Sequence, residues 1–215
     1  MAPPHPHGRI ERFQEMTEAA RAATLQATLA TRPAGAPIWV FAYGSLMWRP
    51  CFSFHEKRFG RLPGYHRDYT IWTIIARGSP DFPGLGLALD EGGDHCPGMV
   101  FRLDETPDVL AEDLKALWAR EMLTGIYRPR WLPIETREGP VEAIAFVVDR
   151  DHQQYAGHLS DQDRALIIAR ACGQFGPCAE YLSRTVEALA DAGAPDPALE
   201  MLLARVETIL ALPEG

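Results

Sequence analysis

The spacing of hydrophobic positions changes twice along the chain. From residue 9 to about residue 31, an alanine-rich stretch carries apolar side chains three or four positions apart, which predicts a helix. Residues 38–149 instead contain short apolar runs rich in β-branched and aromatic residues, separated by glycine and proline, which predict strands. From residue 160 onward the helical spacing returns, with breaks near 173–177 and 193–197. Strands in the middle and helices toward both ends predict an α+β fold.

The strand-rich region predicts a small barrel. Its predicted strands are residues 38–43, 59–62, 65–76, 85–89, 98–103, 128–136 and 141–149. Glu91–Asp94 and Glu138–Pro140 have the composition of turns between strands, and Arg77–Gly84 has that of a longer loop. Strands that follow one another this closely favour antiparallel pairing. We therefore expect a small mixed, mostly antiparallel β-barrel of about six strands, with flanking helices and a C-terminal helical segment.

A proline- and glycine-rich segment, Thr31–Pro37, separates the leading helix from the first strand. The first seven residues, rich in proline and histidine, have the composition of a disordered tail. No low-complexity linker interrupts the rest of the chain. We expect residues 1–37 to form an N-terminal tail and the leading helix, and residues 38–215 to form a single domain.

One helix within the strand-rich region carries a carboxylate on its apolar side. Residues 107–123 have helical spacing, with Leu110, Leu114 and Leu117 on one stripe. Glu121 continues that stripe at the end of the helix. Burying a carboxylate costs several kcal/mol unless something compensates. Burial also raises a carboxyl pKa toward neutrality, where a general base or acid works best.

Two interpretations of Glu121 follow from this position. It could serve a catalytic site, or it could be a structural residue that pairs with an arginine such as Arg120, Arg128 or Arg130. Another acidic residue, Glu180, lies beside Tyr181 in a predicted helix and could be a buried hydrogen-bonding partner.

The first strand leads into a second candidate feature. The run Ile38–Trp48 is apolar through Phe41, breaks at Tyr43-Gly44-Ser45 and then becomes apolar again. A buried strand that ends in a glycine turn exposes backbone N–H groups, and glycine lets a ligand approach the main chain closely. The simpler interpretation is a core strand followed by an ordinary turn.

Composition narrows the classes of partner. The 215 residues carry a formal net charge of -8, which disfavours nucleic acid and anionic membranes as partners. No apolar run is long enough to span a bilayer, and the N-terminal stretch lacks the apolar core of a signal peptide. We therefore expect a cytosolic protein. Its four cysteines, Cys51, Cys96, Cys172 and Cys178, show no zinc-site spacing and are expected to be free thiols.

Other catalytic motifs are weak or missing. Ser45 lacks the surroundings of a nucleophile elbow, and the seven histidines form no metal-binding run. Glycine-rich phosphate motifs do not occur after a predicted strand. No metal or cofactor is expected.

Six segments occur in a characteristic order along the chain. They are WVFAYGSLMW at 39–48, RGSPDFPG at 77–84, the glycine turn with Cys96-Pro97-Gly98, WAREMLTGIY at 118–127, Tyr155-Ala156-Gly157 and Glu180-Tyr181-Leu182. In this order they resemble the ChaC family of γ-glutamylcyclotransferases, which degrade glutathione. The resemblance extends from about Ile38 to Ser183. The residue two before Glu180 is usually asparagine in the family and here is Cys178, a change in one wall of the implied pocket.

The resemblance implies a small β-barrel with flanking helices and a specific activity. Glutathione would be cyclised at its γ-glutamyl group to 5-oxoproline, releasing Cys-Gly and requiring no cofactor. Glu121 maps onto the family's catalytic glutamate and would act as general base and acid. Tyr43, Gly44, Ser45, Leu46 and Met47 would hold the γ-glutamyl end, and Tyr155 would orient the substrate or relay a proton.

Two rival functions stay open at this point. One is a cyclotransferase that acts on other γ-glutamyl amines or amino acids. The other is a non-catalytic carboxylate-binding or transport-regulating protein that uses the same loop. For partners, we expect the small-molecule substrate glutathione, no nucleic acid, no membrane, and a monomer or weak dimer.

Overall fold

The computed structural model describes residues 9–212, so the predicted disorder of residues 1–7 lies outside the described residues. Internal contacts divide the chain into two compact units. The barrel unit comprises Gln14–Arg67 and Leu89–Asp149, and the helical unit comprises Asp68–Ala88 and the chain from Arg150 onward, with the residues up to Phe13. Each unit is described by itself.

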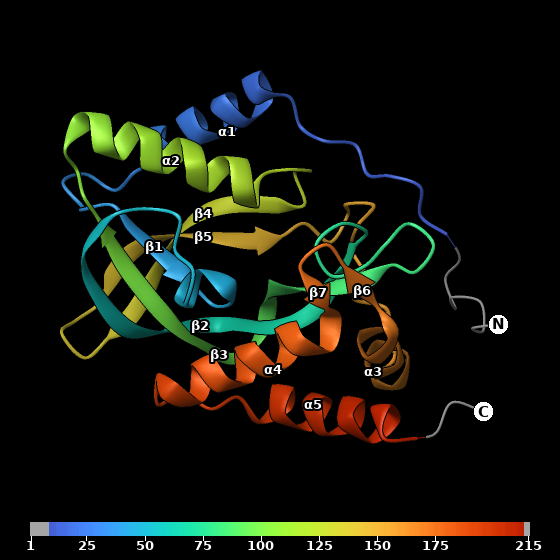
Figure 1. Cartoon of the computed structure of the whole chain (residues 1–215). Coiled ribbons are helices and arrows are strands. Elements are labelled where there is room, and N and C mark those ends of the chain that lie inside the picture. Colours follow the sequence, from blue (N-terminus) through green and yellow to red (C-terminus); the bar gives the residue numbers. More distant parts are fainter. Residues whose placement is uncertain (1–8, 213–215) are drawn as a thin grey trace. The chain divides into compact units, whose positions relative to one another are not determined.

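Five strands close the barrel (Figure 1). They are β1 (Trp39–Ala42), β2 (Phe54–Thr73), β3 (Gly84–Leu103), β4 (Tyr127–Thr136) and β5 (Val141–Val148), in the order β1-β3-β2-β4-β5. β1 pairs antiparallel with β3 and parallel with β5, whereas β4 pairs antiparallel with both β5 and β2. The predicted α+β class and mixed, mostly antiparallel barrel are confirmed, with five barrel strands in place of about six.

Two of the barrel strands are longer than the sequence pattern predicts. β2 runs through the predicted break after residue 62, and β3 runs through the predicted turn Glu91–Asp94. In β2, Gly64 has a φ of 75°; in β3, Gly92 and Gly93 have φ values of 103° and 79°. Glycine adopts positive φ at little cost, so these residues can bend a strand without ending it. The predicted break after residue 62 and the predicted turn Glu91–Asp94 were therefore wrong.

The core of the barrel unit joins β1 to the helix α2 (Pro107–Glu121). Every residue of β1 is buried, as are Leu114, Leu117 and Trp118 of α2. The Trp118 ring meets Phe146 of β5 edge to face, with ring centroids 5.2 Å apart. The predicted apolar stripe of α2 thus packs on the barrel and fixes the position of the end of the helix.

The leading helix α1 (Glu18–Ala30) begins nine residues later than predicted. The Thr17 side chain accepts a hydrogen bond from the Ala20 amide and caps the helix there. α1 contacts α2 through a 3.1 Å hydrogen bond from Trp118 Nε1 to Thr24 Oγ1. Trp131 Nε1 of β4 donates to the Thr28 carbonyl at 2.7 Å. The helix is therefore part of the barrel unit, and the expected single domain over 38–215 stays a prediction.

Within residues 9–212, the helical unit contains three helices and a short two-stranded hairpin. They are α3 (Asp161–Arg170), β6 (Cys172–Gly173), β7 (Gly176–Pro177), α4 (Cys178–Asp191) and α5 (Pro197–Leu210). Both predicted breaks in this region are confirmed, because the hairpin lies between α3 and α4, and residues 192–196 separate α4 from α5.

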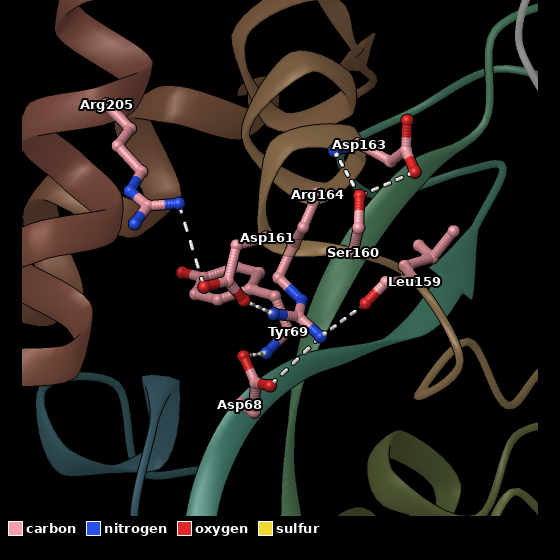
Figure 2. Close-up of polar contacts among 8 residues, drawn as sticks. All are labelled: Asp68, Tyr69, Leu159, Ser160, Asp161, Asp163, Arg164 and Arg205. Carbon is pink, nitrogen blue, oxygen red and sulfur yellow. Dashed lines mark hydrogen bonds and ion pairs between the residues drawn. The ribbon is translucent and has the colours of Figure 1, made fainter.

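The buried side chain of Arg164 links the start of α3 to nearby residues of the helical unit (Figure 2). Arg164 lies 3.0 Å from Asp161 and 3.2 Å from Asp68, and it donates to the Leu159 carbonyl. Ser160 caps α3 by accepting a hydrogen bond from the Asp163 amide. Arg205 of α5 reaches Asp161 at 3.6 Å, so one carboxylate joins α3 and α5.

Candidate functional site

The loop after β1 is fixed to the barrel from several sides. Ser45–Met47 forms a single 3-10 turn, and the Met47 amide donates to the Gly44 carbonyl at 2.8 Å. The Tyr43 hydroxyl donates to the Phe146 carbonyl at 3.0 Å, and Arg67 donates to the Tyr43 carbonyl. A loop held in this way presents its main chain in one fixed conformation.

The five predicted loop residues do not all have the same surroundings. Tyr43 is buried at 8% exposure and Leu46 at 7%, and Leu46 belongs to the hydrophobic core with Met47 packed against it. These side chains hold the loop in place. Gly44 is buried as well, whereas Ser45 is partly exposed.

Glu121 is the last residue of α2, and its side chain is 15% exposed. Burial raises the pKa of this carboxyl above its ordinary value, and the positive charge of Arg120 opposes that rise. The position at the end of the apolar stripe matches the prediction. The arginine pairing that the sequence left open is also present, because Arg120 Nε lies 3.2 Å from Glu121 Oε1.

Arg120 joins the carboxylate to the loop. Its Nη2 donates to Ser45 Oγ at 2.8 Å, and its Nη1 donates to the Arg49 carbonyl at 2.7 Å. The structure therefore brings Ser45 and Glu121 together through one guanidinium. Sequence reasoning named Arg120 only as a possible structural partner of Glu121. The bond to Ser45, 75 positions away, carries no signal in the sequence.

A thiol completes this cluster. Burial raises the pKa of Cys51, the Arg120 charge opposes the rise, and the Glu121 charge adds to it. The thiol therefore favours its neutral form, which places no second negative charge beside the carboxylate.

Tyr155, the remaining predicted site residue, belongs to the helical unit. It forms an isolated bridge with Ile71, and its amide donates to the His152 carbonyl at 2.9 Å. A Cβ atom on Gly157 would lie 2.1 Å from the Tyr155 hydroxyl. The Tyr-x-Gly spacing therefore has a packing reason: the glycine leaves room for the tyrosine ring.

The family-divergent position, Cys178, is fully buried in the helical unit. Its Sγ donates to the Leu85 carbonyl at 3.1 Å, and burial raises its pKa to about 12. Glu180 is not the buried partner that the sequence suggested. Its side chain is 39% exposed and pairs with Arg77 at 3.6 Å and with Arg184.

Residues 9–212 contain no cluster of three or more histidine, cysteine or acidic side chains placed to hold a metal ion. All four cysteines are free, as expected. Within the same described range, no helix is long and apolar enough to cross a membrane.

Comparison with known proteins decides the family. The model of the family described as ChaC-like protein matches residues 38–209. The chain belongs to the ChaC family. This ChaC-family chain is 40% identical over 211 residues to the glutathione-specific gamma-glutamylcyclotransferase of Escherichia coli, covering 97% of this chain and 90% of that one. It is 30% identical over 179 residues to human glutathione-specific gamma-glutamylcyclotransferase 1, covering 80% of each chain.

The fold of this ChaC-family chain also occurs in a solved structure. The yeast gamma-glutamyl cyclotransferase specific to glutathione aligns with a TM-score of 0.75 at 19% identity, covering 84% of this chain and all of the yeast chain. At this identity the likeness concerns the fold, and it agrees with the barrel and helices described above.

Proposed function

We propose that this protein is an enzyme that cyclises the γ-glutamyl group of glutathione and releases 5-oxoproline and Cys-Gly. The observation that carries the proposal is a shielded carboxylate with a raised pKa, joined through one guanidinium to a fixed glycine loop. The names of the bacterial and vertebrate relatives support glutathione as the substrate.

The reaction needs no water. The α-amine of the γ-glutamyl residue attacks its own γ-carbonyl carbon and closes a five-membered ring. The amide C–N bond then breaks, and the cysteinyl nitrogen leaves as the amine of Cys-Gly. The protein must bend the substrate, remove a proton from the attacking ammonium and deliver one to the leaving nitrogen. Fixed geometry between reacting groups can contribute several kcal/mol to such a step.

Glu121 is the proposed general base and acid. A carboxylate must be ionised to accept the ammonium proton, and a raised pKa makes it a stronger base, so that the proton stays on the carboxyl until the leaving nitrogen takes it. Both requirements meet at a pKa closer to neutrality than that of an exposed glutamate, which is the direction of the shift at Glu121. Backbone N–H groups at Gly44 and Ser45 are proposed to hold the γ-glutamyl end, with Tyr43, Leu46 and Met47 supporting them.

Tyr155 is proposed to orient the substrate or to relay a proton. We place the reaction in the cytosol, where glutathione is abundant, and propose that the protein works as a monomer or weak dimer without nucleic acid or membrane partners. The absence of a metal from the scheme follows from the chemistry, since proton transfer and positioning suffice for the ring closure.

Replacement of one carboxyl oxygen tests the proposal. Glu121→Gln keeps the shape of the side chain and removes its basicity, so we expect 5-oxoproline formation to fall by about a hundredfold or more. Glutathione binding should remain within a few-fold of wild type by calorimetry. Glu112→Gln, on the exposed side of the same helix, is the matched control and should keep full activity. Normal turnover by Glu121→Gln would overturn the mechanism.

A substrate series tests the rival functions. Two Arabidopsis thaliana relatives are named gamma-glutamylcyclotransferase without mention of glutathione, at 31% and 28% identity, which makes broader specificity worth measuring. Release of 5-oxoproline from glutathione but not from γ-glutamyl-alanine supports the proposal. Release from both indicates a general γ-glutamyl cyclotransferase, and binding without release from either indicates a non-catalytic binding protein.

A further inference from the structure

We propose that Arg120 is a positioning residue that holds the Glu121 carboxylate in a fixed position relative to the Gly44–Ser45 loop and favours the ionised form of that carboxylate. This inference rests on the proposed function, because it assigns Arg120 a task in the same reaction. It concerns the barrel unit alone, in which all the contacts used below lie.

The pairing of Arg120 with its direct neighbour needs an explanation. Consecutive residues on a helix point about 100° apart, so an arginine does not normally face the glutamate that follows it. Here the guanidinium turns back toward Glu121, with Nε 3.2 Å from Oε1. Two other contacts, to Ser45 Oγ and to the Arg49 carbonyl, hold it in that orientation. Every guanidinium nitrogen is therefore engaged, each with a different residue.

The chain of contacts runs from the loop to the carboxylate. Ser45 and the Arg49 carbonyl belong to the segment that follows β1, and this segment is anchored by the buried Leu46. Arg120 fixes the Glu121 oxygen relative to that segment. If the Gly44–Ser45 main chain holds the γ-glutamyl end, the same guanidinium sets the distance between base and substrate. The planar fork of an arginine suits this task better than the single ammonium of a lysine.

Charge gives Arg120 a second effect on the same carboxylate. Burial favours protonated Glu121, and the Arg120 charge favours the ionised form. Cys51 is the other titratable group of the described residues with a resolved electrostatic effect in this cluster, and its pKa is raised so that it stays neutral. Arg120 is thus the cation that offsets the burial of the base, and without it a larger share of Glu121 carries a proton at a given pH.

Three variants test this role by steady-state kinetics across pH. Arg120→Met removes the positive charge and the planar guanidinium group but keeps a long unbranched side chain. We expect kcat to fall about tenfold or more with KM within about threefold, because a charge-assisted contact to the base is lost. The acidic limb of the kcat/KM profile should move to higher pH. Arg120→Lys should restore the position of that limb while recovering only part of kcat.

The third variant separates geometry from charge. Ser45→Ala keeps the cation and removes one of its anchors, so we expect a smaller loss of kcat and no movement of the acidic limb. Lys115→Met is the matched control, since it removes an exposed cation from the same helix and should leave both kcat and the pH profile unchanged. Circular dichroism and melting of each variant show whether it is folded before its kinetics are interpreted.

Two results would overturn the inference. An Arg120→Met variant whose acidic limb stays at the wild-type pH would show that Arg120 does not set the ionisation of the base. A loss expressed wholly in KM would show that Arg120 binds substrate directly. If Glu121→Gln is inactive, either of these results overturns only the role of Arg120, and the proposed function is kept. If Glu121→Gln is active, the proposed function itself is wrong.

Discussion

At the scale of single residues, Glu121 combines two opposing influences. Its helix buries it, and the neighbouring arginine compensates only in part, so its pKa lies above that of an exposed glutamate. A folded state that raises an acid's pKa binds the proton more tightly than the unfolded chain does. The free energy of unfolding therefore falls as the pH rises from the ordinary value of 4.5 through the raised pKa.

This linkage predicts that the proposed catalytic residue costs stability. Glu121→Gln should melt at a higher temperature than wild type near neutral pH, because the neutral amide avoids the burial of a charge. The two proteins should converge in melting temperature below pH 4.5, where the glutamate is protonated in both states. Thermal denaturation over a pH series measures the difference. A wild type that is the more stable protein at neutral pH would mean that the Arg120 contact outweighs burial.

Cysteine labelling tests the burial of Cys178. Burial raises the pKa of Cys178 to about 12, so the thiol stays protonated at pH 8, and the side chain is fully buried. Iodoacetamide should therefore label the exposed Cys172 and leave Cys178 unmodified until the protein unfolds. Peptide mass spectrometry before and after denaturation gives both yields. Rapid labelling of native Cys178 would contradict the packing described here.

Residues differ in how far the sequence could reveal them. Helical periodicity predicts that Glu121 lies on the same stripe as Leu114 and Leu117, and that stripe is buried. Arg120 was not placed in the site because neighbouring helical positions point in different directions and its loop partners are distant in sequence. Periodicity reports which side of a helix a residue occupies, but not where a long, flexible side chain ends.

At the scale of secondary-structure elements, the pairing of β1 with β3 depends on one close approach. A Cβ atom on Gly98 would lie 2.4 Å from the Ala42 carbonyl oxygen and 2.7 Å from a carbon of the Phe41 ring. Both neighbours are in the buried strand β1 that leads into the candidate loop. The absence of a side chain at Gly98 therefore permits the register in which β1 and β3 pair.

Adding one methyl group tests this approach. Gly98→Ala should lower the free energy of unfolding by about 1–3 kcal/mol, as expected for overpacking in a dense core. Gly86→Ala in the same strand is the matched control, because the added methyl would meet its nearest atoms at an ordinary 3.7 Å. Urea denaturation of both variants measures the difference. Equal stability of the two would show that the β1–β3 contact can relax.

Helices and strands were predicted with different success for a physical reason. The C-terminal helices begin and end at local signals, such as the Ser160 cap and the Asp196 cap before Pro197, and such signals are visible in the sequence. The long strands were divided wrongly because a glycine with positive φ can end a strand or bend it. Which of the two occurs depends on pairing partners that the local sequence does not contain.

At the scale of the whole chain, the sequence order of strands and helices was sufficient to predict the α+β class and a mixed barrel. Closure itself depends on long-range pairs such as Trp39 with Ala143 and Leu89 with Val147. These parallel pairs join segments that are distant in the chain, and no local pattern specifies their register. The resemblance to the ChaC family implied a small barrel with flanking helices and did not specify these pairs.

The closure of the barrel also affects the tendency of the protein to aggregate at high concentration. Each of the five barrel strands has a neighbour on both sides, although β2 and β4 pair over only two residues on each strand. An open sheet offers an outer strand onto which another polypeptide can add, and this is a common route to aggregation and amyloid. The closed topology of the barrel therefore disfavours strand addition, and charged residues or prolines are not needed to block an outer strand.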